Sequence, residues 1–93
     1  GQNDSRDGLQ ITSPLRATTY TQRIGKPVAI ALRADRASGA GKLYWFADDA
    51  WLGSTEGGVA LGWTPERAGN HVLRVVDEAG RSDSRVVAVE FVP

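Results

Sequence analysis

The sequence contains no cysteine and no long apolar run. Without cysteine, the chain can form neither a disulfide framework nor a thiolate metal site. Its longest uncharged apolar run is Val28 to Leu32, whereas a membrane-spanning helix needs about 20 apolar residues. The sequence therefore predicts that this chain does not insert into a membrane.

The sequence also has no excess of either charge. Eleven basic residues balance eleven acidic ones, and nine of the basic residues are arginine. Domains that bind nucleic acid usually show a basic excess on one face, because phosphates carry negative charge. We therefore expect no nucleic-acid partner, while the preference for arginine suits contacts with planar anionic groups.

The beginning of the sequence lacks the basic and apolar segments of a secretory signal. The first residue is Gly1 rather than methionine, so we expect a piece of a longer protein, with any targeting segment outside it. Residues 1–8 are polar and show no periodicity, which is typical of a flexible linker remnant. Residues 9–93 remain for one folded domain.

Short apolar and aromatic segments alternate with turn residues along the rest of the chain. In the clearest case, aliphatic residues occur at every second position, at Val28, Ile30 and Leu32. This period of two predicts a strand on which the three side chains share one face. Segments of this type are Leu9–Thr12, Thr18–Thr21, Val28–Leu32, Leu43–Phe46, Trp51–Leu52, Val59–Trp63, Asn70–Asp77 and Arg85–Val92. With the second segment read as a continuation of the first, they give about seven strands. This pattern predicts an all-β fold, an immunoglobulin-like or fibronectin III-like antiparallel β-sandwich.

Two local signals refine this prediction. Pro14 has no N–H to donate, so the first strand should lie at a sheet edge. Between the last two strands, Gly80 can supply the positive φ that a hairpin connection needs.

No residue pattern indicates catalysis. His71 is the only histidine, and it shares the parity of the inward residues Leu73 and Val75, so we assign it a structural or rim position. Gly39-Ala40-Gly41-Lys42 lacks the spacing and the hydroxyl residue of a phosphate loop. Acidic residues occur in turns, where side-chain bonds to backbone N–H groups explain them as well as a calcium site would. These residues are Asp48, Asp49, Asp77, Glu78 and Asp83. We therefore predict no catalytic residue, no metal site and no cofactor.

The sequence leaves the role of the aromatic residues open. Trp45 should lie in the core, and Trp63 in the core or at its rim. Tyr44 and Phe46 then share the face opposite Trp45, with Trp51 beside them in the next strand. An exposed aromatic strip could bind a glycan or a protein, and cross-strand packing that only stabilises the sheet is the alternative. Nearby arginines such as Arg33 or Arg74 could meet anionic groups.

Several motifs occur in a characteristic order. They are Ile11-Thr12-Ser13-Pro14, Leu43-Tyr44-Trp45-Phe46-Ala47-Asp48, Trp63, Gly69-Asn70-His71-Val72-Leu73-Arg74-Val75-Val76-Asp77 and Gly80-Arg81. In this order, the chain resembles the C-terminal domain of bifunctional penicillin-binding proteins of the 1C type, over residues 9–92. That family usually has Asp-Gly where this chain has Asp48-Asp49, so we expect a turn of another type here. It usually has a small or aliphatic residue near Trp51, so this ring is expected to be particular to this protein.

The resemblance implies a parent enzyme anchored in the bacterial inner membrane, with glycosyltransferase and transpeptidase domains that build peptidoglycan in the periplasm. The catalytic residues of such parents lie in those other domains, and the Ser-x-x-Lys and Lys-Thr-Gly signatures of the transpeptidase are absent from this chain. From this architecture we expect a non-catalytic accessory domain, and we expect it to be a monomer in isolation.

Two roles remain open for such a domain. It would bind peptidoglycan or a cell-wall partner protein through Tyr44, Phe46, Trp51, Arg33 and Arg74. Alternatively, it would be a structural domain that docks on the transpeptidase domain of its own parent or acts as a spacer. An enzyme in its own right is disfavoured because no acid/base pair has an interpretable spacing.

Overall fold

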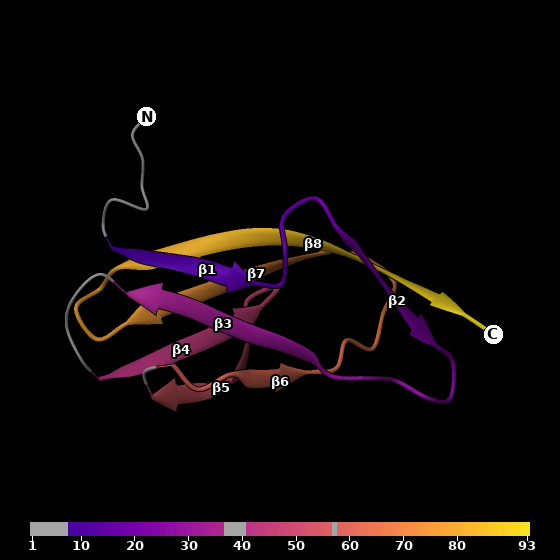
Figure 1. Ribbon diagram of the computed structural model, residues 1–93, viewed down its shortest axis with the longest axis horizontal. Helices are drawn as coiled ribbons and strands as arrows, with labels where there is room; N and C mark the ends of the chain where they lie inside the picture. Colours follow the sequence, from indigo (N-terminus) through magenta and orange to yellow (C-terminus); the bar gives the residue numbers. More distant parts are fainter. Residues whose placement is uncertain (1–7, 37–40, 57) are drawn as a thin grey trace.

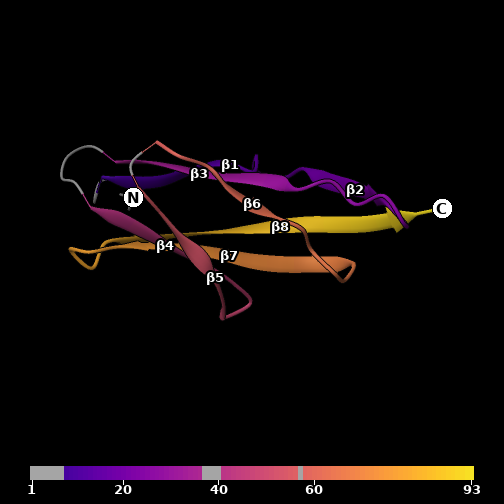
Figure 2. The ribbon, with the colours of Figure 1, turned by 90° about the horizontal axis from the view of Figure 1, so that it is seen from below.

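Eight β-strands form two sheets that pack face to face in the computed structural model, which describes residues 8–36, 41–56 and 58–93 (Figures 1 and 2). The strands are β1 (Leu9–Ser13), β2 (Thr19–Arg23), β3 (Ile30–Arg36), β4 (Lys42–Ala47), β5 (Ala50–Glu56), β6 (Leu61–Trp63), β7 (Gly69–Asp77) and β8 (Ser82–Val92). One sheet has the order β1-β3-β6 and the other β2-β8-β7-β4-β5. The predicted all-β sandwich is confirmed, and the described part of the chain contains no helix that could cross a membrane. Except for Gly8, the predicted linker lies outside the described residues.

The eighth strand arises because β2 is not a continuation of β1. The chain crosses to the other sheet after Pro14, and β2 pairs in parallel with β8, Tyr20 opposite Val89. One long-range and one local hydrogen bond hold the crossover: the Arg85 guanidinium donates to the Pro14 carbonyl at 2.6 Å, and the Leu15 N–H donates to the Tyr20 hydroxyl at 2.9 Å. β1 lies at the edge of its sheet, as the proline predicted.

Alternating side chains of both sheets fill the space between them. Trp45 has no exposed surface and Trp63 is 7% exposed, which confirms the core positions predicted for both. The other buried hydrophobic residues are Leu9, Ile11, Ile30, Leu32, Ala34, Leu43, Ala47, Leu73, Val75, Val87 and Val89. Burial of a valine, leucine or isoleucine side chain stabilises the fold by roughly 1.5–3 kcal/mol.

Val28 does not share the buried face of Ile30 and Leu32, contrary to prediction. It precedes β3, and its side chain is 69% exposed. Its backbone bonds to a buried side chain instead of a neighbouring strand: the Val28 N–H donates to Gln22 Oε1 at 2.7 Å, and Gln22 Nε2 donates to the Val28 carbonyl at 2.8 Å. The Gln22 side-chain amide thus makes the two bonds to the Val28 backbone that a neighbouring strand would otherwise make, and β3 begins at Ile30.

The β7–β8 hairpin is held by one carboxylate. Asp77 Oδ1 accepts from the N–H groups of Ala79 and Arg81, each at 2.9 Å, and Oδ2 accepts from Arg81 Nε at 2.7 Å. Burial by itself raises the pKa of Asp77, but the bonds from Arg81 and Ala79 together outweigh it, so the pKa is lowered. Gly80 has φ 87°, as predicted for this turn.

The β4–β5 hairpin has two central residues in the left-handed region. Asp48 has φ 51° and Asp49 has φ 70°, between the paired residues Ala47 and Ala50. Positive φ at both positions is what a type I′ turn requires, and it is the turn that Asp-Gly also forms. The expectation of another turn type was therefore wrong, because aspartate tolerates this conformation.

Replacing the second turn residue by glycine should stabilise the domain. Asp49→Gly removes the Cβ crowding of a non-glycine residue at positive φ, and we expect the free energy of unfolding to rise by about 0.5–1 kcal/mol. Urea unfolding followed by tryptophan fluorescence measures this. Asp48→Gly is the matched control and should destabilise the domain, since Asp48 makes the bonds described below. A loss of stability in Asp49→Gly would contradict the turn assignment.

Candidate functional site

The outer face of the five-stranded sheet is open. In Figure 2, no described segment is drawn beyond this sheet on the side away from β1 and β3. Sheets of soluble proteins usually present polar residues on such a face, and large apolar ones there mark interaction sites. This face carries aromatic and aliphatic side chains, so it is the first candidate site.

Three rings form an aromatic cluster on the outer face, made of Tyr44, Phe46 and Trp51. The Trp51 ring centroid lies 6.0 Å from that of Tyr44 and 5.8 Å from that of Phe46. Trp51 is 57% exposed, while the other two rings are half-buried beneath it. The rings therefore pack across strands, and Trp51 leaves one ring face exposed.

A β-bulge in β5 changes which residues face inward after Trp51. Phe46 pairs with Trp51 and Trp45 pairs with Gly53, so Leu52 is an extra residue without a partner in β4. Gly53 has φ 150°, a conformation that residues with a side chain rarely adopt. Leu52 packs against the core while Trp51 remains outside, and the bulge places Ser54 opposite Tyr44.

The two predicted arginines lie on different sheets. Arg74 is exposed on β7, directly opposite Phe46, and belongs to the outer face. Arg33 lies on β3 in the other sheet, where its Nη1 donates to the Gly58 carbonyl at 2.9 Å. The structure therefore brings Arg74, but not Arg33, to the aromatic cluster.

Two exposed valines extend the apolar surface beyond the rings. Val72 on β7 is 47% exposed and pairs with Val86 on β8, which is 55% exposed. Val86 shares its parity with the exposed Glu90, so its outward position could have been predicted from the sequence. Neither valine was part of the predicted site.

One carboxylate ties the β4–β5 turn to β7. Asp48 Oδ1 accepts from the Val72 N–H at 2.9 Å, and Oδ2 lies 2.6 Å from His71 Nδ1. The other ring nitrogen of His71 lies 2.8 Å from the Arg67 carbonyl, and the ring packs edge-on against Trp63. Each ring nitrogen of His71 thus has a hydrogen-bond partner. His71 is buried and structural, consistent with its predicted position.

The pKa of Asp48 lies below its ordinary value of 3.8. The hydrogen bond from the Val72 N–H is the largest cause, and the bond from His71 is the next largest. A carboxyl whose pKa is lower in the folded chain stabilises the fold fully above its unfolded pKa, and this stabilisation is lost as the pH falls through the folded pKa. Acid should therefore release the turn that carries Trp51.

Removing the charge of Asp48 should make the free energy of unfolding depend less on pH in acid. We expect Asp48→Asn to lower the free energy of unfolding at pH 7 by about 1 kcal/mol. The decline between about pH 5 and pH 2 should be shallower than in the unmodified domain. Urea unfolding at stepped pH measures both effects, with Glu90→Gln on the outer face as the control. Parallel curves for the domain and Asp48→Asn would show that this carboxylate does not couple stability to pH.

Comparisons with known proteins agree on the kind of domain. The family model of the penicillin-binding protein C-terminus family matches residues 1–90. Among solved structures, the fibronectin(III)-like modules of CbhA from Clostridium thermocellum are similar, with a TM-score of 0.68 and 18% identity over 91% of this chain and 99% of that one. At this identity the likeness shows the fold alone. No curated protein matched the chain.

Proposed function

Since the chain belongs to the penicillin-binding protein C-terminus family, we propose that it is the non-catalytic accessory domain of a periplasmic peptidoglycan synthase and binds glycan strands. The parent would carry the glycosyltransferase and transpeptidase activities and be anchored in the inner membrane. The observation that carries the proposal is the aromatic cluster with one free face of Trp51 on an open sheet.

The cluster has the parts that sugar recognition uses. A flat exposed indole can stack on the C–H face of a pyranose, and the rings beneath it hold the indole in place. The Tyr44 hydroxyl donates to Glu78 Oε2 at 3.4 Å, which places a polar edge with a carboxylate beside the rings. Arg74 can meet the carboxylates that the muramyl units and their peptides carry.

The groups that could support catalysis are used in structural bonds. Asp48 and His71 bond to each other and to backbone groups, and Asp77 closes its own hairpin. These contacts support a binding role over a catalytic one, because a general base must be able to reach a substrate proton.

The exposed valines favour a second candidate function. Val72 and Val86 continue the apolar surface past the rings, farther than stacking on one sugar requires. A protein interface uses such a strip with an aromatic anchor near it. The partner would then be the transpeptidase domain of the same parent or a cell-wall protein.

A titration with soluble muropeptides tests the glycan proposal. Amide shifts in a ¹H–¹⁵N spectrum should move at Tyr44, Phe46, Trp51 and Arg74. Trp51→Ala should weaken binding at least about fivefold, since an aromatic anchor that is buried on binding contributes more than about 1 kcal/mol. Val59→Ala is the matched control, because Val59 is also exposed but lies away from the outer face.

No shift at these four residues with millimolar muropeptide would remove the glycan proposal. In that case, association of the isolated domain with a purified transpeptidase domain tests the second candidate. Val86→Asp should abolish that association, because it puts a charge in the apolar strip, and should leave any glycan binding at Trp51 in place.

A further inference from the structure

One cross-strand row of residues on the outer face joins the aromatic cluster to polar groups. Strand pairing places Trp51 opposite Phe46 and Phe46 opposite Arg74. Arg74 in turn lies opposite Ser84, so the row crosses β5, β4, β7 and β8. Neighbouring strands are about 4.8 Å apart, so the backbones at Trp51 and Arg74 are separated by about 10 Å. This separation is close to the length of a disaccharide.

Arg74 is an unpaired cation in this row. It is exposed, and within the described part of the chain its side chain has no hydrogen bond and no ion pair. Its outer-face neighbours along β7 are Val72 and Val76, and Phe46 lies opposite it on β4. Apolar neighbours lower the local dielectric constant, so an anion that meets Arg74 here is attracted more strongly than in open water.

A carboxylate is the anion that suits this position. The guanidinium of arginine presents a planar fork of N–H groups that matches the two oxygens of a carboxylate. Ser84 is exposed on the next strand, and its hydroxyl can donate a further hydrogen bond to the same group. The row thus offers a stacking surface at one end and donors for a carboxylate at the other.

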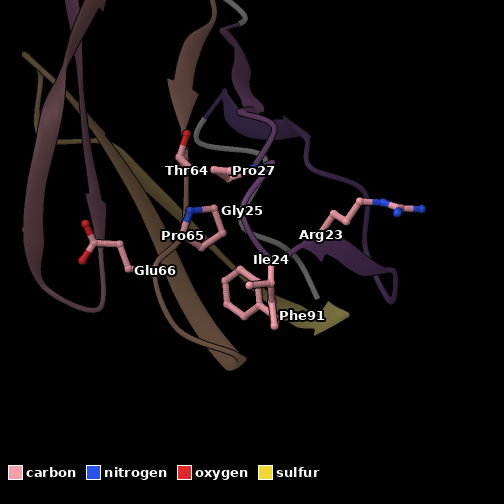
Figure 3. A pocket seen from close by; sticks show the side chains of 8 residues that line it. All are labelled: Arg23, Ile24, Gly25, Pro27, Thr64, Pro65, Glu66 and Phe91. Carbon is pink, nitrogen blue, oxygen red and sulfur yellow. The ribbon is translucent and has the colours of Figure 1, made fainter. Parts of the chain in front are cut away.

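The depression at the end of the sandwich offers no comparable position (Figure 3). Its wall is apolar and includes Ile24, Pro65 and Phe91. The charged side chains at its margin, Arg23 and Glu66, point away from it (Figure 3). Arg23 lies on β2, at the opposite edge of the five-stranded sheet from β5, so this exposed arginine is a matched control for Arg74.

The position of Arg74 favours a carboxylate carried by the glycan itself. A sugar stacked on Trp51 places the next sugar of the strand near Arg74, and a short lactyl substituent of that sugar stays within reach of the guanidinium. The carboxylates of a stem peptide lie farther along a flexible chain, and in Figure 2 no described segment stands beyond the outer face to hold such a peptide. In peptidoglycan, the lactyl carboxylate of a muramyl unit is free only where the stem peptide has been removed, because an amide bond joins the two.

We propose that the outer face binds peptide-free glycan strands, and that Arg74 binds the free lactyl carboxylate of the muramyl unit next to the sugar stacked on Trp51. The strand would cross the sheet along the row, perpendicular to the β-strands. This inference rests on the proposed glycan binding and narrows it to strands that carry a charge on the sugar.

Matched tetrasaccharides test the inference. The first alternates N-acetylglucosamine and N-acetylmuramic acid without peptides, the second is the same compound with methyl-esterified carboxylates, and the third is chitotetraose, which lacks the lactyl groups. Titrations followed in ¹H–¹⁵N spectra give the Kd of each. The acidic tetrasaccharide should bind about threefold more tightly than the other two, as expected for one exposed ion pair. This difference should shrink at high ionic strength, because salt screens the pair.

Variants separate the charge contact from the stacking contact. Arg74→Gln should weaken binding of the acidic tetrasaccharide about threefold and leave binding of chitotetraose unchanged. Trp51→Ala should weaken binding of both, and Arg23→Gln should bind all ligands like the unmodified domain. The urea unfolding curve of Arg74→Gln should match that of the unmodified domain, since Arg74 is exposed and unpaired.

Equal affinity of the unmodified domain for the acidic tetrasaccharide and chitotetraose would overturn the inference and leave the proposed glycan binding intact. Equal weakening of both ligands by Arg74→Gln would also overturn it. The acidic tetrasaccharide with stem peptides attached separates the two sources of carboxylate, and tighter binding of that compound would assign Arg74 to the peptide instead. Absence of binding of all the glycans would remove the proposed function and this inference with it.

Discussion

Burial of the Trp45 side chain between the two sheets decides which residues the outer face carries. Side chains alternate along a strand, so Trp45 in the core forces its neighbours Tyr44 and Phe46 to the opposite side. A register slip by one residue would bury two rings and expose the largest apolar side chain of the domain. The pairing of β4 with β7 is therefore strongly specified, and an aromatic outer face follows directly from a well-packed core.

The β4–β5 hairpin completes the aromatic outer face. Its turn is fastened to β7 through Asp48, and Trp51 pairs with Phe46 directly after it. The bulge then changes the register of β5, so that Gly53 lies opposite Trp45 and Ser54 lies opposite Tyr44. The residues after the bulge are small or polar, so Trp51 is the β5 side chain that gives the outer face a free ring surface.

Alternation and turn chemistry were enough to predict the sandwich, the buried positions of Trp45 and Trp63, and the face shared by Tyr44 and Phe46. They failed where a long-range contact overrides local pattern. β2 pairs with β8 because the chain crosses to the other sheet after Pro14, where Arg85 bonds to the Pro14 carbonyl. Val28 lies outside the buried face because the Gln22 side chain bonds to its backbone N–H and carbonyl. Arg33 could not be separated from the aromatic cluster by sequence, since local spacing does not say which sheet a strand joins.

The chain belongs to the penicillin-binding protein C-terminus family, and the aromatic cluster on its outer face is the surface at which we propose binding. This surface follows from which side chains the core leaves outside, so the exposure of the three tryptophans tests the account most directly. With 5-fluorotryptophan incorporated, ¹⁹F spectra with a soluble paramagnetic agent report on each indole, and Trp51→Phe assigns one signal. We predict strong broadening of the Trp51 signal and protection of Trp45 and Trp63. A broadened Trp45 signal, or a Trp51 signal as protected as the other two, would contradict the arrangement of faces on which the proposals rest.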